Sequence, residues 1–165
     1  EAVTECADNI ASSPFAGRIE AREADFMQFA SDCQFDLIVS NPPFFTERIQ
    51  SPDRLRAAAR HDDSLPLAPL IRGGAELLSD NGRLALVLPA GRDDGALFEA
   101  SLAGLAPTRC CRVFTRAGKP SRRTLWEFSA SASVPCVESQ LFIQNADGTF
   151  TDEYRELLKD FYLDF

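Results

Sequence analysis

The segment FDLIVSNPPF, residues 35–44, decides how the rest of the chain is interpreted. Its first half is a short apolar run, which is typical of a strand buried within a parallel sheet. Pro42 and Pro43 then end the strand, because neither has an N–H to donate to a ladder. Their carbonyls and the amide oxygen of Asn41 remain hydrogen-bond acceptors, and Phe44 adds a flat apolar ring. Acceptors beside an aromatic ring suit a planar ligand that carries an amino group.

The spacing of apolar residues around this segment predicts an α/β domain. Helices are expected at residues 1–11, 64–78, 93–105 and 151–159, and strands at 18–24, 35–39, 83–88, 108–115, 123–130 and 138–145. This order is typical of one domain over residues 1–165 with a mostly parallel sheet. The strands at 108–115 and 123–130 form a hairpin, which gives the sheet one antiparallel edge strand. The Gly73-Gly74 pair inside a helix indicates close packing, because glycine otherwise weakens helices.

The composition fits a globular protein and excludes several classes. The 165 residues are 45% hydrophobic and 25% charged. No apolar run approaches the roughly 20 residues of a membrane span, so no membrane partner is expected. The five cysteines form no CxxC pair and lie far in sequence from the one histidine, so no metal site is expected. Reduced cysteines that pack as small hydrophobes indicate a cytoplasmic protein. No pattern in the residues defines an oligomeric state.

Two polar–aromatic pairs follow predicted strands. Asp25 and Phe26 come after the strand at 18–24, and Asn41 and Phe44 come after the strand at 35–39. Ligands of such sheets bind outside the carboxyl ends of the strands, so these residues are candidates for one site. An acid that ends a strand beside a core phenylalanine is the other interpretation of Asp25 and Phe26.

Basic residues are concentrated in one window of an otherwise acidic chain. The net charge is −8, which argues against indiscriminate binding to nucleic acid. The window 105–126 nevertheless contains six cations and no acid: Arg109, Arg112, Arg116, Lys119, Arg122 and Arg123. Two interpretations stay open, a solvated pair of strands with exposed arginines and a local patch that binds phosphates.

The chain resembles a known family over nearly its whole length. FDLIVSNPPF resembles motif IV of the class I S-adenosylmethionine-dependent amino-methyltransferases, which have a Rossmann-like sheet. Further segments are similar to the bacterial tRNA1(Val) adenine-N6-methyltransferases, which modify the adenine at tRNA position 37. These segments are ARHDDSLPLAPLI (59–71), LLSDNGRLALVLP (77–89) and TDEYRELLKDFYLDF (151–165).

The resemblance implies a cofactor, a partner and roles for individual residues. The cofactor is S-adenosylmethionine, the partner is tRNA, and no metal is required. Asn41 and Pro42 would accept from the adenine N6 amine while Phe44 stacks on the base. Asp25 and Phe26 would hold the adenine of the cofactor, with Asn41 beside it. The candidate contacts to tRNA are Pro43, Phe45, Arg60, His61, Arg116, Lys119, Arg122 and Arg123.

The sequence departs from the family pattern in one respect. The nine glycines form no GxGxxG run, which such families place after their first strand. We therefore expect the methionine and ribose sites upstream of Glu1, with this chain forming the C-terminal part of a methyltransferase domain. Arg60 and His61 also suit a plain loop that leads into a helix.

Two other functions remain open on the sequence. The same NPP(F/Y) site serves guanine N2 in ribosomal RNA, adenine in DNA and glutamine in proteins, because all present a planar nitrogen. A module that binds RNA without catalysis is the alternative from a different class.

Overall fold

The computed structural model describes residues 1–43, 67–131 and 135–162. Within it the chain divides into two compact units, Glu1–Ala30 and Ser31–Phe165.

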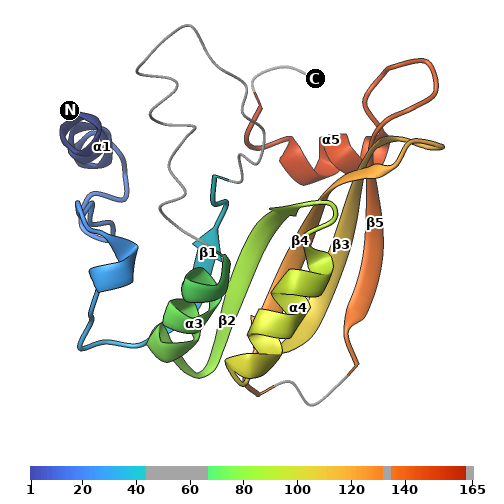
Figure 1. The fold of residues 1–165 in the computed structure, drawn as a ribbon. Helices are drawn as coiled ribbons and strands as arrows, with labels where there is room; N and C mark the ends of the chain where they lie inside the picture. The colour runs from blue at the N-terminus through green and yellow to red at the C-terminus, as the bar shows by residue number, and fades with distance from the viewer. Residues whose placement is uncertain (44–66, 132–134, 163–165) are drawn as a thin grey trace, which may run out of the picture. The chain divides into compact units, whose positions relative to one another are not determined.

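The second unit contains a five-stranded sheet with the order β1-β2-β4-β3-β5 (Figure 1). The strands are β1 (Phe35–Ser40), β2 (Leu78–Pro89), β3 (Ala106–Arg116), β4 (Ser121–Ser129) and β5 (Val137–Gln144). The helices are α3 (Leu67–Leu77), α4 (Asp93–Leu102) and α5 (Asp152–Leu158). All of the predicted elements from residue 35 onward are therefore confirmed within the described residues, with shifted ends; residues 64–66 of the predicted helix lie outside them.

The predicted hairpin is confirmed, but its position at the sheet edge is wrong. β4 lies between β2 and β3 and runs antiparallel to both, whereas β1–β2 and β3–β5 are parallel pairs. Burial explains this position, because Trp126 is only 6% exposed and Phe128 is fully buried. A strand with such side chains gains most when strands lie on both sides of it. The more exposed β5 forms one edge instead. The other edge is β1, so the buried position expected for residues 35–39 is wrong: β1 pairs with β2 alone, and Leu37 and Val39 are 50% and 67% exposed.

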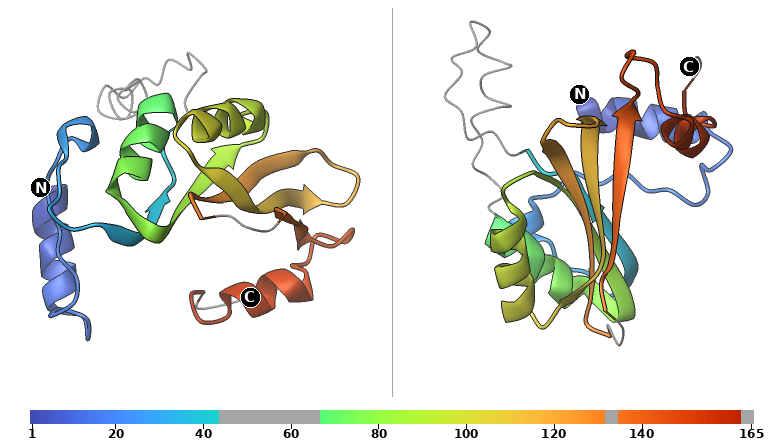
Figure 2. Two further views of the ribbon diagram at one scale, coloured as in Figure 1. Left: turned by 90° about the horizontal axis from the view of Figure 1, so that it is seen from below. Right: turned by 90° about the vertical axis from the view of Figure 1, so that its right-hand side faces the viewer.

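One face of this sheet carries the core. Leu84, Leu86 and Leu88 alternate along β2 and are buried, as are Trp126 and Phe128 opposite them on β4. Helices α3 and α4 cover this face (Figure 2). Close packing of α3 is confirmed, since a Cβ added at Gly74 would lie 3.2 Å from a methyl carbon of Leu84.

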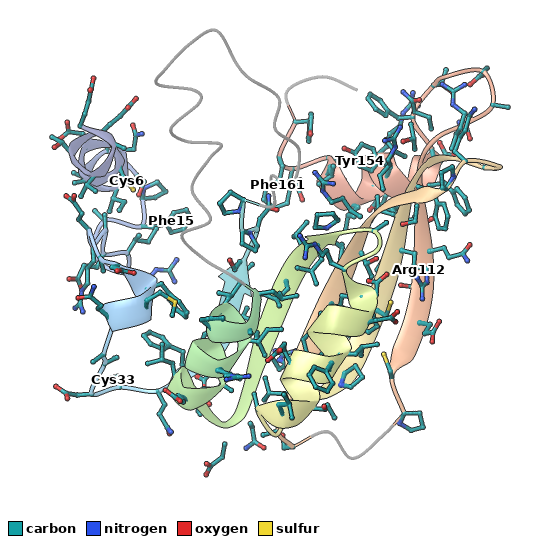
Figure 3. All side chains as sticks on the ribbon, in the orientation of Figure 1. Cys6, Phe15, Cys33, Arg112, Tyr154 and Phe161 are labelled. Carbon is teal, nitrogen blue, oxygen red and sulfur yellow. The ribbon has the colours of Figure 1, made fainter. Side chains whose placement is uncertain are left out.

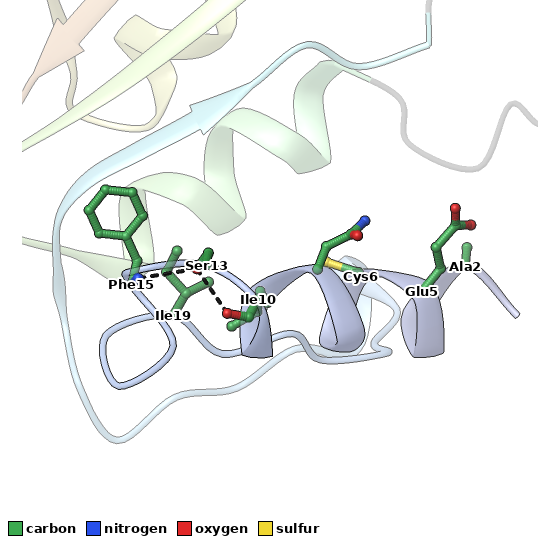
Figure 4. A pocket seen from close by; sticks show the side chains of 8 residues that line it. Ala2, Glu5, Cys6, Ile10, Ser13, Phe15 and Ile19 are labelled. Carbon is green, nitrogen blue, oxygen red and sulfur yellow. Dashed lines mark hydrogen bonds between the residues drawn. The ribbon is translucent and has the colours of Figure 1, made fainter.

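The first unit contains α1 (Ala2–Ala11) and the 3₁₀ helix η1 (Phe26–Gln28). The helix predicted at residues 1–11 is confirmed, but the strand predicted at 18–24 is wrong. Those residues have no strand beside them to pair with inside this unit, and an unpaired segment cannot form a sheet. One side of α1, with Phe15 and Ile19, borders an open groove of about 440 Å³ (Figure 4).

The described ranges contain neither a membrane-spanning helix nor a group of metal-ligating side chains. Within them no helix is long and apolar enough to cross a membrane. The same ranges contain no group of three or more side chains that could ligate a metal.

Candidate active site at the carboxyl edge of the sheet

The Asn41 segment leaves the sheet at the carboxyl end of β1. Pairing of β1 with β2 ends at Ser40, which lies opposite Leu86. Beyond it, Asn41 and Pro43 are exposed, whereas Pro42 is buried. The buried proline anchors the segment to the fold and leaves the Asn41 amide open to a ligand. No other described group forms a hydrogen bond with that amide.

The neighbouring turn between β2 and α4 lies at the same edge of the sheet. Gly91 adopts a φ of 93°, which a residue with a side chain rarely adopts, and the chain then enters α4 at Asp93. The backbone N–H of Ala90 donates to the carbonyl of Arg122 over 3.2 Å, which ties this turn to the start of β4.

Asp93 links three elements at this edge, which sequence analysis missed. Its Oδ1 accepts from the Trp126 indole N–H over 2.8 Å, and its Oδ2 lies 3.7 Å from the Arg112 guanidinium. Arg112 is labelled in Figure 3. The only signal in the sequence was the acidic pair Asp93-Asp94 at a helix start, where negative charge is favoured. That signal says nothing of the two partners, which come from β3 and β4.

The structure separates the six basic residues of the 105–126 window. Arg112 is in the ion pair with Asp93, and Arg109 lies near the other end of β3. The remaining four, namely Arg116, Lys119, Arg122 and Arg123, gather where β3 turns into β4.

Asp25 belongs to the first unit and does not end a strand as predicted. Its carboxylate caps η1, where Oδ1 accepts from the Met27 N–H over 2.9 Å and Oδ2 accepts from the Gln28 amide over 3.0 Å. Asp25 itself is exposed and Phe26 is half-buried. Because each carboxylate oxygen has a second lone pair, Asp25 can accept from a further donor.

Four of the predicted site residues lie outside the described residues: Phe44, Phe45, Arg60 and His61.

Asp147 and Cys110 are among the groups of the second unit whose pKa values are perturbed. Two hydrogen bonds from Thr149 lower the pKa of the Asp147 carboxyl, which lies in the turn after β5. Burial raises the pKa of the Cys110 thiol on β3, so this cysteine packs as a neutral side chain.

Solved structures share this fold. A predicted O-methyltransferase from Agrobacterium tumefaciens matches 94% of this chain and 73% of its own, with a TM-score of 0.67 and 18% identity. A putative methyltransferase from Thermoplasma acidophilum matches 84% of this chain and 55% of its own, with a TM-score of 0.52 and 11% identity. The mixed sheet is therefore that of a Rossmann-like class I methyltransferase.

The sequence comparisons define the family more narrowly. A protein of Bacteroides fragilis called tRNA1(Val) (adenine(37)-N6)-methyltransferase is 38% identical over 99% of this chain and 70% of its own length. A protein of Histophilus somni with the same name is 34% identical over 100% of this chain and 69% of its own length. The chain belongs to the family of the tRNA1(Val) (adenine(37)-N6)-methyltransferases. No family model matches it.

Proposed function

We propose that this chain methylates the N6 amine of adenine 37 in tRNA1(Val), with S-adenosylmethionine as the methyl donor. The observation that carries the proposal is the Asn41-Pro42-Pro43 segment at the carboxyl end of β1, with its exposed asparagine and buried proline. In this proposal residues 1–165 belong to one methyltransferase domain, which works in the cytoplasm where tRNA is found.

The acceptors of this segment suit the chemistry of an aromatic amine. The lone pair of adenine N6 is delocalised into the ring, which makes the nitrogen a poor nucleophile. The Asn41 amide oxygen and the Pro42 carbonyl accept from the two N–H groups, which returns electron density to the nitrogen and fixes its direction. Because Pro42 is buried, these acceptors are held in place before the substrate arrives.

The described residues fit part of the cofactor. S-adenosylmethionine, when bound, supplies an electrophilic methyl group on a sulfonium centre. Asp25 presents an exposed carboxylate with lone pairs to spare, beside the half-buried ring of Phe26. This pair suits the adenine of the cofactor, because the acid accepts from its amine and the ring packs against its face. Asn41 lies beside the transferred group in this proposal.

The remaining site residues are assigned to the substrate. Phe44 stacks on the adenine once it has left the RNA stack, and Pro43 and Phe45 line its path. Arg60 and His61 contact the RNA nearby. These assignments rest on the family pattern of residues 35–45 and 59–71.

The test is methylation of purified tRNA by the full-length protein with labelled S-adenosylmethionine, followed by digestion to nucleosides. We expect N6-methyladenosine at position 37 of tRNA1(Val). Label in ribosomal RNA, DNA or protein but not in tRNA would contradict the proposed substrate.

The role of Asn41 is tested by Asn41→Ala, with Asn81→Ala as the control. Asn81 is exposed and lies near the opposite end of β2. Losing one preorganised polar contact to a transition state costs roughly 10²–10³ in kcat, so we expect a loss of that size for Asn41→Ala and none for Asn81→Ala. Both variants should bind tRNA as the wild type does. Full activity of Asn41→Ala would refute the role given to this residue.

A further inference from the structure

The turn between β3 and β4 carries a compact positive charge. Residues 116–123, the hairpin tip, have the sequence RAGKPSRR, so four of eight residues are basic and none is acidic. Gly118, with a φ of 75°, and Pro120 form the turn, and the Lys119 N–H donates to the Arg116 carbonyl over 3.3 Å. The four cations are therefore carried on a fixed turn rather than on a loose loop.

The four cations of the hairpin tip form no ion pair within the described ranges. Arg116 donates to the neutral amide of Gln144 over 3.3 Å, and Arg123 donates to a backbone carbonyl over 3.2 Å. Within the described ranges, none of the four basic side chains forms an ion pair with a carboxylate. The contrast with Arg112 is direct, since that guanidinium is partly neutralised by Asp93.

The turn after β5 carries an acidic residue at this edge of the sheet, and that residue makes contacts of its own. Asp147 follows β5, which pairs with β3. Its Oδ1 accepts from the Thr149 N–H over 2.9 Å and from the Thr149 hydroxyl over 2.7 Å. These bonds hold the carboxylate against its own turn, and among the described residues Asp147 forms no ion pair with the four cations of the hairpin tip.

The strand register places the hairpin tip on the same edge as the Asn41 segment. Arg123 lies opposite Pro89, at the end of β2, and Ser40 lies opposite Leu86, three residues earlier on the same strand. The strands β1 and β4 are separated only by β2, which puts them about 10 Å apart. Figure 1 shows that the end of β1 and the β3–β4 turn both lie toward the upper ends of the strands. An RNA strand that presents a base to Asn41 can therefore reach the tip with its neighbouring phosphates.

We infer that the hairpin tip is the phosphate-binding site for the RNA backbone that adjoins the target adenine. The inference rests on the proposed function, and it adds where the RNA outside the reacting base is held. An RNA backbone is favoured over an acidic protein, because guanidinium groups match phosphate oxygens and a regular charged chain can contact several cations at once. Phosphate contacts position the RNA without taking part in methyl transfer.

The test compares Arg122→Ala and Arg123→Ala, singly and together, with the control Arg109→Ala. Arg109 is also exposed and on the same hairpin, but it lies near the start of β3. At the usual strand rise it is about 13 Å from Val113, the partner of Arg123, and about 23 Å from Arg116. The affinity of the full-length protein for labelled tRNA1(Val) is measured by fluorescence anisotropy at several salt concentrations, from low to physiological. Methyl transfer is measured on the same preparations.

We expect the double variant to bind tRNA at least about tenfold more weakly, since each charged hydrogen bond counts for more than a neutral one. The slope of log K against log salt should fall by about 0.7–0.9 for each phosphate that the variant no longer binds. KM for tRNA should rise while kcat at saturating tRNA stays unchanged, which a misfolded protein would not show. The variant Arg122→Lys with Arg123→Lys should recover most of the salt slope.

Each other result overturns the inference. Unchanged affinity and salt slope would show that the tip does not touch the RNA, and an equal effect of Arg109→Ala would show only a general charge effect. A fall in kcat without a rise in KM would show that the hairpin tip acts in the methyl-transfer step rather than in RNA binding. If the wild-type protein binds tRNA but methylates no adenine, the proposed function fails, while the anisotropy comparison still decides the role of the tip.

Discussion

Replacing Asp93 tests whether its contacts hold α4 to the sheet at the candidate active site. Asp93→Ala removes the acceptor of the Trp126 indole N–H, which donates over 2.8 Å from a residue that is 6% exposed. A buried donor left without a partner costs about 1–3 kcal/mol. The Arg112 pair adds little, about 0–1 kcal/mol, because that side chain is 42% exposed and the atoms are 3.7 Å apart. We therefore expect a loss of roughly 2–3 kcal/mol in the free energy of unfolding.

Two further variants separate the hydrogen bond from the charge. Asp93→Asn keeps an acceptor oxygen and should lose only about 1 kcal/mol, from the ion pair and the helix N-terminus. Asp94→Ala is the matched control, since this exposed acid lies in the same helical turn. It should lose no more than about 0.3–1 kcal/mol.

The assay is equilibrium unfolding in urea, followed by fluorescence of the one tryptophan and by circular dichroism. An Asp93→Ala protein within about 0.5 kcal/mol of the wild type would refute the reasoning, because the buried donor would then cost nothing. Equal losses of unfolding free energy for Asp93→Ala and Asp93→Asn would show that the charge of Asp93, not its hydrogen bond with the Trp126 indole, holds α4 to β3 and β4.

Two more predictions follow from the second unit. Gly82→Ala should lower the free energy of unfolding by about 1–3 kcal/mol in the same urea assay, because an added Cβ would lie 2.7 Å from the Phe35 carbonyl oxygen; wild-type stability would contradict this. Thr149→Ala removes the hydroxyl bond and keeps the backbone one, so it should raise the pKa of Asp147 part of the way toward its ordinary value in an NMR titration; an unchanged pKa would exclude the Thr149 hydroxyl as a cause. Because the folded state lowers this pKa, the carboxylate stabilises its turn above the ordinary pKa of aspartate, and the stabilisation is lost as pH falls through the lowered value.

The parts of the candidate site that depend on neighbouring residues in the chain were predictable. The apolar run before Asn41 forms β1, and the prolines after it end the pairing, since both effects act through the local backbone. The cap of α5 is of the same kind, because Thr151 accepts from the Tyr154 N–H three residues later.

The contacts of Asp93 with β3 and β4 could not be predicted in this way. Its partners Arg112 and Trp126 lie 19 and 33 residues away and reach it only after β3 and β4 have paired. The strand predicted at 18–24 failed for a related reason, because apolar spacing identifies a segment that can pair but not whether a partner is present.

By itself, the sequence determined the α/β class, the Asn41 segment and the hairpin with its basic turn, because these follow from local backbone preferences and from short spacings. Only the tertiary structure decided that β4 lies inside the sheet and that four of the six basic residues share the edge of Asn41. Strand order depends on which side chains gain most from burial against distant strands, and spacing along the chain does not encode that choice. The same order places Arg112 beside Asp93 and leaves the hairpin tip positively charged.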